Sequence, residues 1–144
     1  MINPGEKDIL MPFVRISLKN GRSDKERLAI GDCVHRAMVK ALRIPEADHF
    51  QVITDHGTDL VYDPDYLNIH RTDGIIMIQI TMALGRTPDQ KKALFSAIAE
   101  LLSADQGVRK EDVFVTLVEI PKENWSFGNG IAQYADAPPP HLAR

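Results

Sequence analysis

The chain has 144 residues, of which 44% are hydrophobic and 26% are charged, as expected of one globular domain with its own core. Its 17 lysines and arginines are outnumbered by 20 aspartates and glutamates, and no basic cluster stands out, which argues against a nucleic-acid partner. No apolar run approaches the ~20 residues of a membrane-spanning helix, and residues 1–10 lack the features of a signal peptide. We therefore expect a cytoplasmic protein with no membrane partner, and the single cysteine, Cys33, agrees with a reducing compartment.

The first half of the sequence predicts a strand, a helix and a second strand. Residues 14, 16 and 18 are apolar and alternate with polar residues, which is the period of a half-buried strand. A capping box follows, in which Ser23 and Glu26 satisfy amides at a helix start, and the next apolar residues recur at spacings of three and four. The segment 49–53, HFQVI, has the aromatic and β-branched content of a second strand.

The same plan returns 64 positions later. Identical residues at this offset include Gly21 and Gly85, Arg22 and Arg86, Asp48 and Asp112, and Phe50 and Phe114. A strand at 75–82, a capping box from Thr87 with Pro88 at the first helical position, and a strand at 114–118 complete the second copy. Strand–helix–strand crossovers leave their strands parallel, so the duplicated β-α-β units predict an α+β fold: a four-stranded mixed sheet with two helices on one face.

A pseudo-twofold axis between the copies would make their first strands antiparallel. Pro12, at the start of the first strand, would then lie near the end of the third strand, just ahead of Arg86. The start of the parallel second strand, after Asp48, would lie at the same edge of the sheet. The equivalent corner of the other copy would hold the counterparts of these three residues, namely Ile76, Asp112 and Arg22.

Three segments fall outside the duplicated plan. Residues 57–74 are rich in turn formers and predict a long loop, and Gly128 and Gly130 around Asn129 predict a tight turn. The prolines at 138–140 predict an extended end. We divide the chain into an N-terminal extension or misassigned start at 1–11, a domain at 12–134 and a proline-rich tail at 135–144.

The dipeptide Met11-Pro12 has the form of a second translation start. Methionine aminopeptidases remove an initiator methionine when the next residue is small, so translation from Met11 would expose Pro12. Inside a chain the nitrogen of Pro12 is an amide and shapes only the strand entrance. At a chain terminus it is a secondary amine with a pKa of about 8, which neighbouring charges can move.

Four motifs carry a family resemblance: MPFVRISLKNGRS, RIPEADHFQVI, GRTPDQKKALF and WSFGNG. With them, the sequence from Pro12 to about Tyr134 resembles the tautomerase superfamily, and within it the malonate semialdehyde decarboxylase-like branch. The resemblance implies a homotrimer that acts on small oxo acids without a cofactor.

The resemblance also implies roles for particular residues. Pro12 would be the acid or base, Asp48 would work beside it, and Arg86 would bind the substrate carboxylate. The family pattern has a second arginine, which falls here on Leu84, and this departure weakens the decarboxylase assignment. The apolar wall of the pocket would be formed by Leu84, Trp125 and Phe127.

Arg86 also fits an anion site on physical grounds, because it stands just ahead of a helix N-terminus with unpaired amides.

The other candidate residues look structural. The five histidines show no metal-ligand spacing. We expect Cys33 in the core, Gly31 at a close packing contact and Arg71 on the surface, with contact to a neighbouring site as the alternative for Arg71.

The protonation state of a terminal Pro12 amine decides which of two reactions it can catalyse. A neutral Pro12 amine is a base that moves a proton to or from carbon, which predicts keto–enol tautomerisation of a 2-oxo acid such as phenylpyruvate. A cationic amine is an acid suited to hydration or decarboxylation of a malonate semialdehyde-like 3-oxo acid. We prefer the tautomerase interpretation. If Pro12 is internal, a non-catalytic trimeric binding protein remains.

Overall fold

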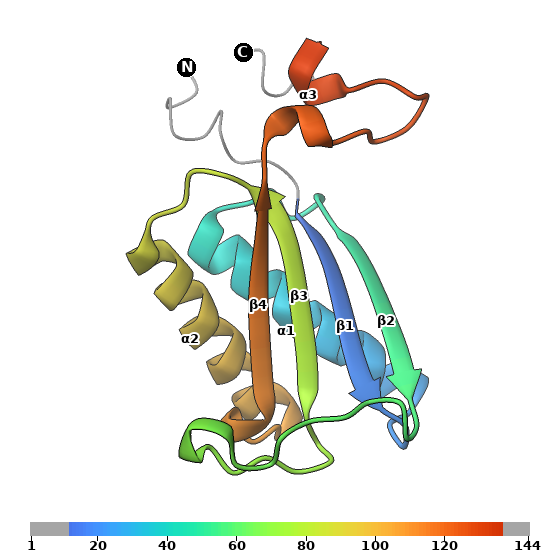
Figure 1. The fold of residues 1–144 in the computed structure, drawn as a ribbon, viewed down its shortest axis with the longest axis vertical. Coiled ribbons are helices and arrows are strands. Elements are labelled where there is room, and N and C mark those ends of the chain that lie inside the picture. The colour runs from blue at the N-terminus through green and yellow to red at the C-terminus, as the bar shows by residue number, and fades with distance from the viewer. Residues whose placement is uncertain (1–11, 137–144) are drawn as a thin grey trace.

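The computed structural model describes residues 12–136, which fold as a layer of helices against one sheet (Figure 1). The strands are β1 Phe13–Lys19, β2 Phe50–His56, β3 Ile76–Ala83 and β4 Val113–Ile120, and the helices are α1 Asp24–Leu42, α2 Pro88–Gln106 and the short α3 Gln133–Asp136. The strand order is β2-β1-β3-β4. Within each copy the strands are parallel, and the two central strands, β1 and β3, are antiparallel. The predicted fold class and the pseudo-twofold arrangement are confirmed.

Both long helices begin at the predicted capping boxes. Ser23 Oγ accepts a hydrogen bond from the Glu26 amide at 3.1 Å, and the Glu26 carboxylate accepts one from the Ser23 amide. The hydrogen bond to Ser23 lowers the pKa of Glu26. Thr87 and Gln90 repeat this pattern at α2. Each box satisfies amides that a helix start leaves unpaired, which stabilises the helix by about 1 kcal/mol.

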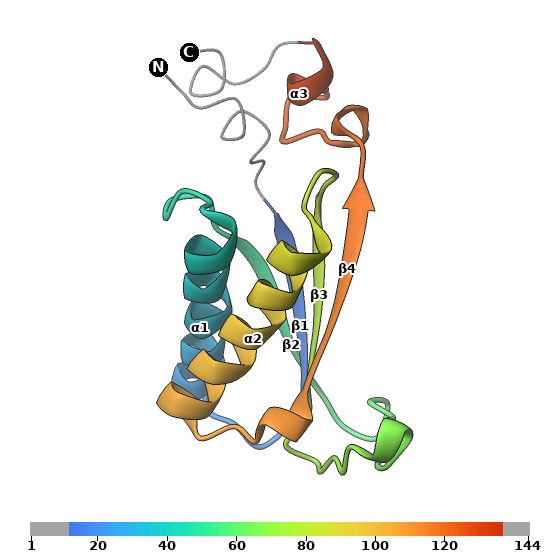
Figure 2. The same ribbon diagram turned by 90° about the vertical axis from the view of Figure 1, so that its left-hand side faces the viewer.

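The core lies between the sheet and the two long helices (Figure 2). Alternate side chains of β1 and β3 are buried beneath α1 and α2, whereas no helix between residues 12 and 136 covers the opposite face of the sheet. That uncovered face carries apolar side chains: Phe50, Val52 and Phe114 are 53%, 42% and 45% exposed. A sheet face of this composition is typical of an interaction surface.

Gly31 brings α1 close to β2, as predicted. Gln51 donates a hydrogen bond from Nε2 to the Gly31 carbonyl at 2.8 Å. A Cβ at position 31 would lie 2.5 Å from Gln51 Oε1 and 2.8 Å from Ile53 Cδ1, so a side chain there would push these groups aside. The absence of a side chain at Gly31 is therefore a packing requirement of this contact.

The outer strands are longer than the predicted segments 49–53 and 114–118. β2 pairs with β1 residue by residue as far as the Lys19–His56 pair, and β4 follows β3 in the same way. Their lengths are therefore set by the central strands that they pair with, and the apolar content of the outer strands alone underestimates them.

Two segments cross the ends of the sheet. The segment 57–75 contains a short 3₁₀ turn at Tyr66–Asn68, and the segment 121–136 contains another at Lys122–Asn124 followed by α3. Residues 128–130 have positive φ angles of 133°, 60° and 69°, which confirms the predicted turn. The predicted extension at 1–11 and most of the predicted tail, 137–144, lie outside the described residues. Between residues 12 and 136, no helix is long and apolar enough to cross a membrane.

Candidate active site

The strand register brings three predicted site residues to one end of the sheet. Phe13 pairs with Phe50 of the parallel strand β2 and with Thr81 of the antiparallel strand β3. The starts of β1 and β2 and the end of β3 therefore lie together, at the top of Figure 1. Pro12 is buried at this edge, Asp48 lies two residues before β2, and Arg86 follows β3.

Arg86 is half-buried between the end of β3 and the start of α2. Its Nη1 donates to the carbonyl of Ala83, the last residue of β3, at 3.5 Å. Gly85 has a φ of 120°, which a residue with a side chain rarely adopts, so glycine permits the turn that delivers Arg86 to the helix entrance. A guanidinium at this position adds to the positive end of the helix and favours an anion.

Asp48 is half-buried in the connection between α1 and β2. Its backbone amide donates to the Pro45 carbonyl at 3.0 Å, which closes a turn just before the strand. No hydrogen bond or ion pair joins its carboxylate to another residue in the range 12–136. Within that range the carboxylate is therefore not committed to another side chain.

Aromatic side chains of the segment 121–136 pack over the same end of β3. The rings of Trp125 and Phe127 are stacked at 5.4 Å, and Phe127 meets the edge of Tyr134 at 4.7 Å. Tyr134 is buried against Ala83, with Trp125 packed on the pair. These contacts attach the aromatic residues to the strand end that Arg86 also touches. Leu84 beside them is 55% exposed.

Two members of this wall were missed by the sequence analysis. Tyr134 completes the aromatic cluster, and Gln133 holds the turn by accepting from the Phe127 amide at 2.9 Å and donating to the Gly128 carbonyl at 2.8 Å. Their position after the glycine turn is the signal that could have found them. Gln133 and Tyr134 follow Gly130 by three and four residues and begin the short helix α3.

The equivalent corner of the second copy holds Arg22 and Asp112, as the pseudo-twofold predicts, and this corner is closed. Arg22 donates from Nη2 to the Gly74 carbonyl at 3.0 Å. Asp112 is 1% exposed and accepts hydrogen bonds from the Thr72 amide at 2.7 Å and the Thr72 hydroxyl at 2.6 Å. The chain entering β3 thus occupies this corner and satisfies its aspartate and arginine. Asp112 therefore has a structural role.

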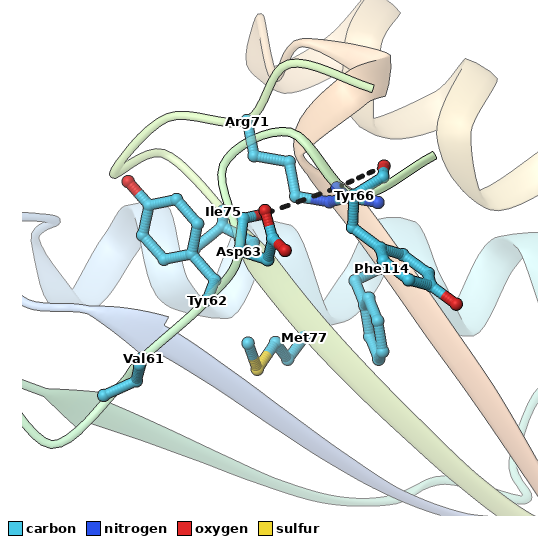
Figure 3. A pocket seen from close by; sticks show the side chains of 8 residues that line it. All are labelled: Val61, Tyr62, Asp63, Tyr66, Arg71, Ile75, Met77 and Phe114. Atoms are coloured by element: carbon cyan, nitrogen blue, oxygen red, sulfur yellow. Dashed lines mark hydrogen bonds between the residues drawn. The ribbon is translucent and has the colours of Figure 1, made fainter. Parts of the chain in front are cut away.

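A cavity of about 250 Å³ lies at the same end of the sheet as the closed corner (Figure 3). It is lined by side chains of the segment 57–75 and the uncovered face: Val61, Tyr62, Asp63, Tyr66, Arg71, Ile75, Met77 and Phe114. Arg71 donates from Nη1 to the carbonyls of Asp63, Tyr66 and Ile69, so it acts as a brace for this loop. The cavity is therefore remote from the Pro12 corner.

Two other predictions concern residues away from the corner. Cys33 is fully buried on α1, as predicted, and burial raises the pKa of its thiol. In the described part of the chain, no group of three or more histidine, cysteine, aspartate or glutamate side chains is arranged to hold a metal ion.

The fold defines a class of protein: a duplicated β-α-β domain with one closed corner and an equivalent corner that holds Pro12, Asp48 and Arg86. The sequence model of the family described as "Tautomerase enzyme" matches residues 48–128, and a second model with that description matches residues 12–62. The probable tautomerase YusQ of Bacillus subtilis (strain 168) is 45% identical over 124 residues, which cover 85% of this chain and 98% of that protein. The chain belongs to the tautomerase family.

Solved structures support the same assignment. A malonate semialdehyde decarboxylase described as FG41 and inhibited by 3-bromopropiolate is 40% identical, with a TM-score of 0.79 and coverage of 85% of this chain and 93% of that chain. A second malonate semialdehyde decarboxylase, studied for its decarboxylase and hydratase activities, is 28% identical with the same TM-score and covers 85% and 95%. Family membership and these neighbours support an enzyme with tautomerase or decarboxylase/hydratase activity.

Proposed function

We propose that this chain is a cofactor-independent tautomerase of small 2-oxo acids such as phenylpyruvate. The observation that carries the proposal is the strand register that gathers the start of β1, the start of β2 and the end of β3 at one edge. In this mechanism Pro12 is the general acid and base, Arg86 binds the substrate carboxylate, and Asp48 orients the substrate or a water molecule. The apolar wall consists of Leu84, Trp125 and Phe127.

The mechanism requires Pro12 to be the first residue of the working enzyme. A peptide-bonded proline nitrogen has no basic lone pair, so the reaction needs residues 1–11 to be absent from the mature chain. The catalytic domain is then 12–134, followed by the tail at 135–144. If Pro12 remains internal, the proposal is replaced by a non-catalytic trimeric binding protein.

The proton transfer balances within the site. The neutral Pro12 amine takes the hydroxyl proton of the enol, and the resulting ammonium gives a proton to the adjacent carbon, which yields the keto acid and restores the amine. Arg86 holds the carboxylate throughout, so it contributes to binding in both the enol and the keto state. Beside a Pro12 ammonium, the Asp48 carboxylate would raise the pKa of the amine, whereas the Arg86 charge and the apolar wall would lower it.

The rival reaction at the same corner is hydration or decarboxylation of a malonate semialdehyde-like 3-oxo acid. The two malonate semialdehyde decarboxylases among the structural neighbours favour it. The charge of the amine separates the two interpretations, because the tautomerase needs a neutral base and the rival needs a cationic acid. Titration of a ¹⁵N-labelled Pro12 amine by NMR measures this directly: a pKa clearly above neutral counts against the tautomerase.

Leu84→Arg should shift the chain toward the rival reaction. A second guanidinium beside Arg86 restores the paired-arginine pattern and gives a bound carboxylate a second charged donor. We expect this gain to outweigh the opposing effect of the added charge, which lowers the pKa of the amine. We expect the ratio of malonate semialdehyde turnover to phenylpyruvate tautomerisation to rise about tenfold, measured as kcat/KM for each substrate. Leu84→Gln, which is polar but uncharged, is the matched control and should leave the ratio unchanged. An equal shift in both variants would contradict an electrostatic origin.

We further propose that the chain assembles as a homotrimer. Three solved structures of fused 4-OT are described as trimers, although at 18–22% identity they support the fold alone. The uncovered sheet face of this chain, with Phe50, Val52 and Phe114 exposed, is the surface that neighbouring copies would bury. Light scattering coupled to size exclusion should give three times the chain mass, and Val52→Glu should reduce it toward the monomer. A single-chain mass for the unsubstituted protein would overturn this proposal.

A further inference from the structure

His35 is a buried histidine on α1 that the proposed mechanism does not use. It is 5% exposed, and its Nε2 lies 2.7 Å from the carbonyl oxygen of Glu46. Its ring also stacks on the ring of His49, with centroids 4.0 Å apart and planes 7° from parallel. One imidazole thus contacts two separate points of the connection between α1 and β2.

These two points flank Asp48 in the chain. Glu46 lies two residues before it and His49 one residue after it. The amide of Asp48 is held independently by the Pro45 carbonyl. The direction of the Asp48 carboxylate therefore depends on the backbone between Glu46 and His49. Both of these residues contact the His35 ring.

The chemistry of the contact defines the protonation of His35. A carbonyl oxygen only accepts hydrogen bonds, so Nε2 carries a hydrogen and donates a hydrogen bond to the Glu46 carbonyl oxygen. The other ring nitrogen, Nδ1, is buried and has no hydrogen-bond partner among residues 12–136. A buried polar atom without a partner is unfavourable for folding, and an apolar ring would remove that cost while keeping the stacking. The N–H of His35 therefore serves the Glu46 carbonyl, in the connection that carries Asp48, and not apolar packing of the core.

We propose that His35 is a positioning residue that holds the Asp48 carboxylate in its working direction, through the Glu46 carbonyl and the His49 ring. The inference rests on the proposed function, because it assigns His35 a role through Asp48. Arg86, which binds the substrate carboxylate in that function, is carried by a different connection. Loss of the His35 contacts should accordingly lower kcat and leave KM nearly unchanged.

The principal test compares His35→Phe with His35→Gln in the chain that begins at Pro12. His35→Phe keeps a ring on His49 but removes the donor, and we expect kcat for phenylpyruvate to fall about tenfold with KM within about twofold. His35→Gln keeps an N–H near the former Nε2 and should recover kcat to within about threefold of the unsubstituted enzyme. Ile98→Val, a core change on α2, is the control for general destabilisation and should leave kcat unchanged at the assay temperature.

Combination with Asp48→Asn identifies the route of the effect. If His35 acts through Asp48, His35→Phe should cause no further loss of kcat in the Asp48→Asn background. An equal loss in both backgrounds, or a change below about twofold from His35→Phe alone, would overturn the positioning role. If Asp48→Asn itself leaves kcat unchanged, the role of Asp48 in the proposed function fails first, and this inference falls with it.

His49→Ala keeps the test decisive if His35→Phe does not fold. His49 is exposed, so its loss should be tolerated by the fold, yet it removes the outer half of the ring stack. We expect a fall in kcat of about threefold with KM unchanged. An unchanged kcat would overturn the part of the proposal that rests on the ring stack.

Discussion

A chain that begins at Pro12 should tautomerise phenylpyruvate about a thousandfold faster than a chain that retains residues 1–11, because a positioned acid–base group contributes rate factors of this order. In the longer chain the nitrogen of Pro12 is an amide and can neither accept nor deliver the proton. The loss of the enol absorbance after mixing measures the rate. Intact-mass spectrometry of each preparation must accompany the assay, since a small fraction of trimmed chain would dominate the observed activity.

Pro12→Ala, also prepared as the first residue, is the matched control. It keeps a terminal amine at the start of β1 but changes it from secondary to primary, so we expect an intermediate rate. Full activity in a preparation whose mass shows Met1 in place would contradict the proline mechanism. If the Pro12→Ala chain is as slow as the chain that retains residues 1–11, we would conclude that the proline ring, and not the free amine alone, is responsible for the rate.

The closed corner explains why the amino terminus matters physically. At the pseudo-equivalent position, Thr72 donates two hydrogen bonds to Asp112, and the Gly74 carbonyl accepts from Arg22. The chain entering β3 thus fills the corner with its own polar groups. The proposed function requires that, in a chain that begins at Pro12, the corner beside Asp48 and Arg86 is not filled in this way and can admit a substrate.

Much of the fold could be predicted from local sequence signals. The capping boxes at Ser23 and Thr87 marked both helix starts, and the repeat at an offset of 64 positions implied the sheet and its antiparallel centre. These signals are reliable because they arise from the backbone's own hydrogen-bonding needs at a helix start and from strand periodicity.

Contacts between distant segments could not be predicted in the same way. The outer strand ends depend on pairing with β1 and β3, the place of Tyr134 depends on Ala83 and Phe127, and the His35–His49 stack joins a helix to a loop. None of these leaves a periodic signal. Asp48 and Asp112 show most clearly what local sequence cannot predict. They are identical residues at equivalent positions of the repeat, yet Asp48 is half-buried and Asp112 accepts a hydrogen bond from the Thr72 amide.

Arg86→Ala should raise KM for 2-oxo acids about ten- to hundredfold, the range expected when a hydrogen-bonded ion pair of about 1.5–3 kcal/mol is lost. Because the proposed function has Arg86 bind the carboxylate in the enol and the keto state alike, we expect a smaller effect on kcat than on KM. Arg86→Lys should recover part of the binding, since it keeps the charge but not the two-pronged geometry. Steady-state kinetics with phenylpyruvate measure both constants.

Arg22→Ala is the internal control that the duplication provides. It removes the pseudo-equivalent arginine, whose guanidinium donates to Gly74 in the closed corner, so it should lower the melting temperature without changing KM. A methyl ester of the substrate offers a second comparison, because it has no carboxylate charge and should respond weakly to the loss of Arg86. If Arg86→Ala leaves KM for the free acid unchanged, or affects acid and ester equally, the carboxylate is bound elsewhere and the anion site at the entrance of α2 must be reassigned.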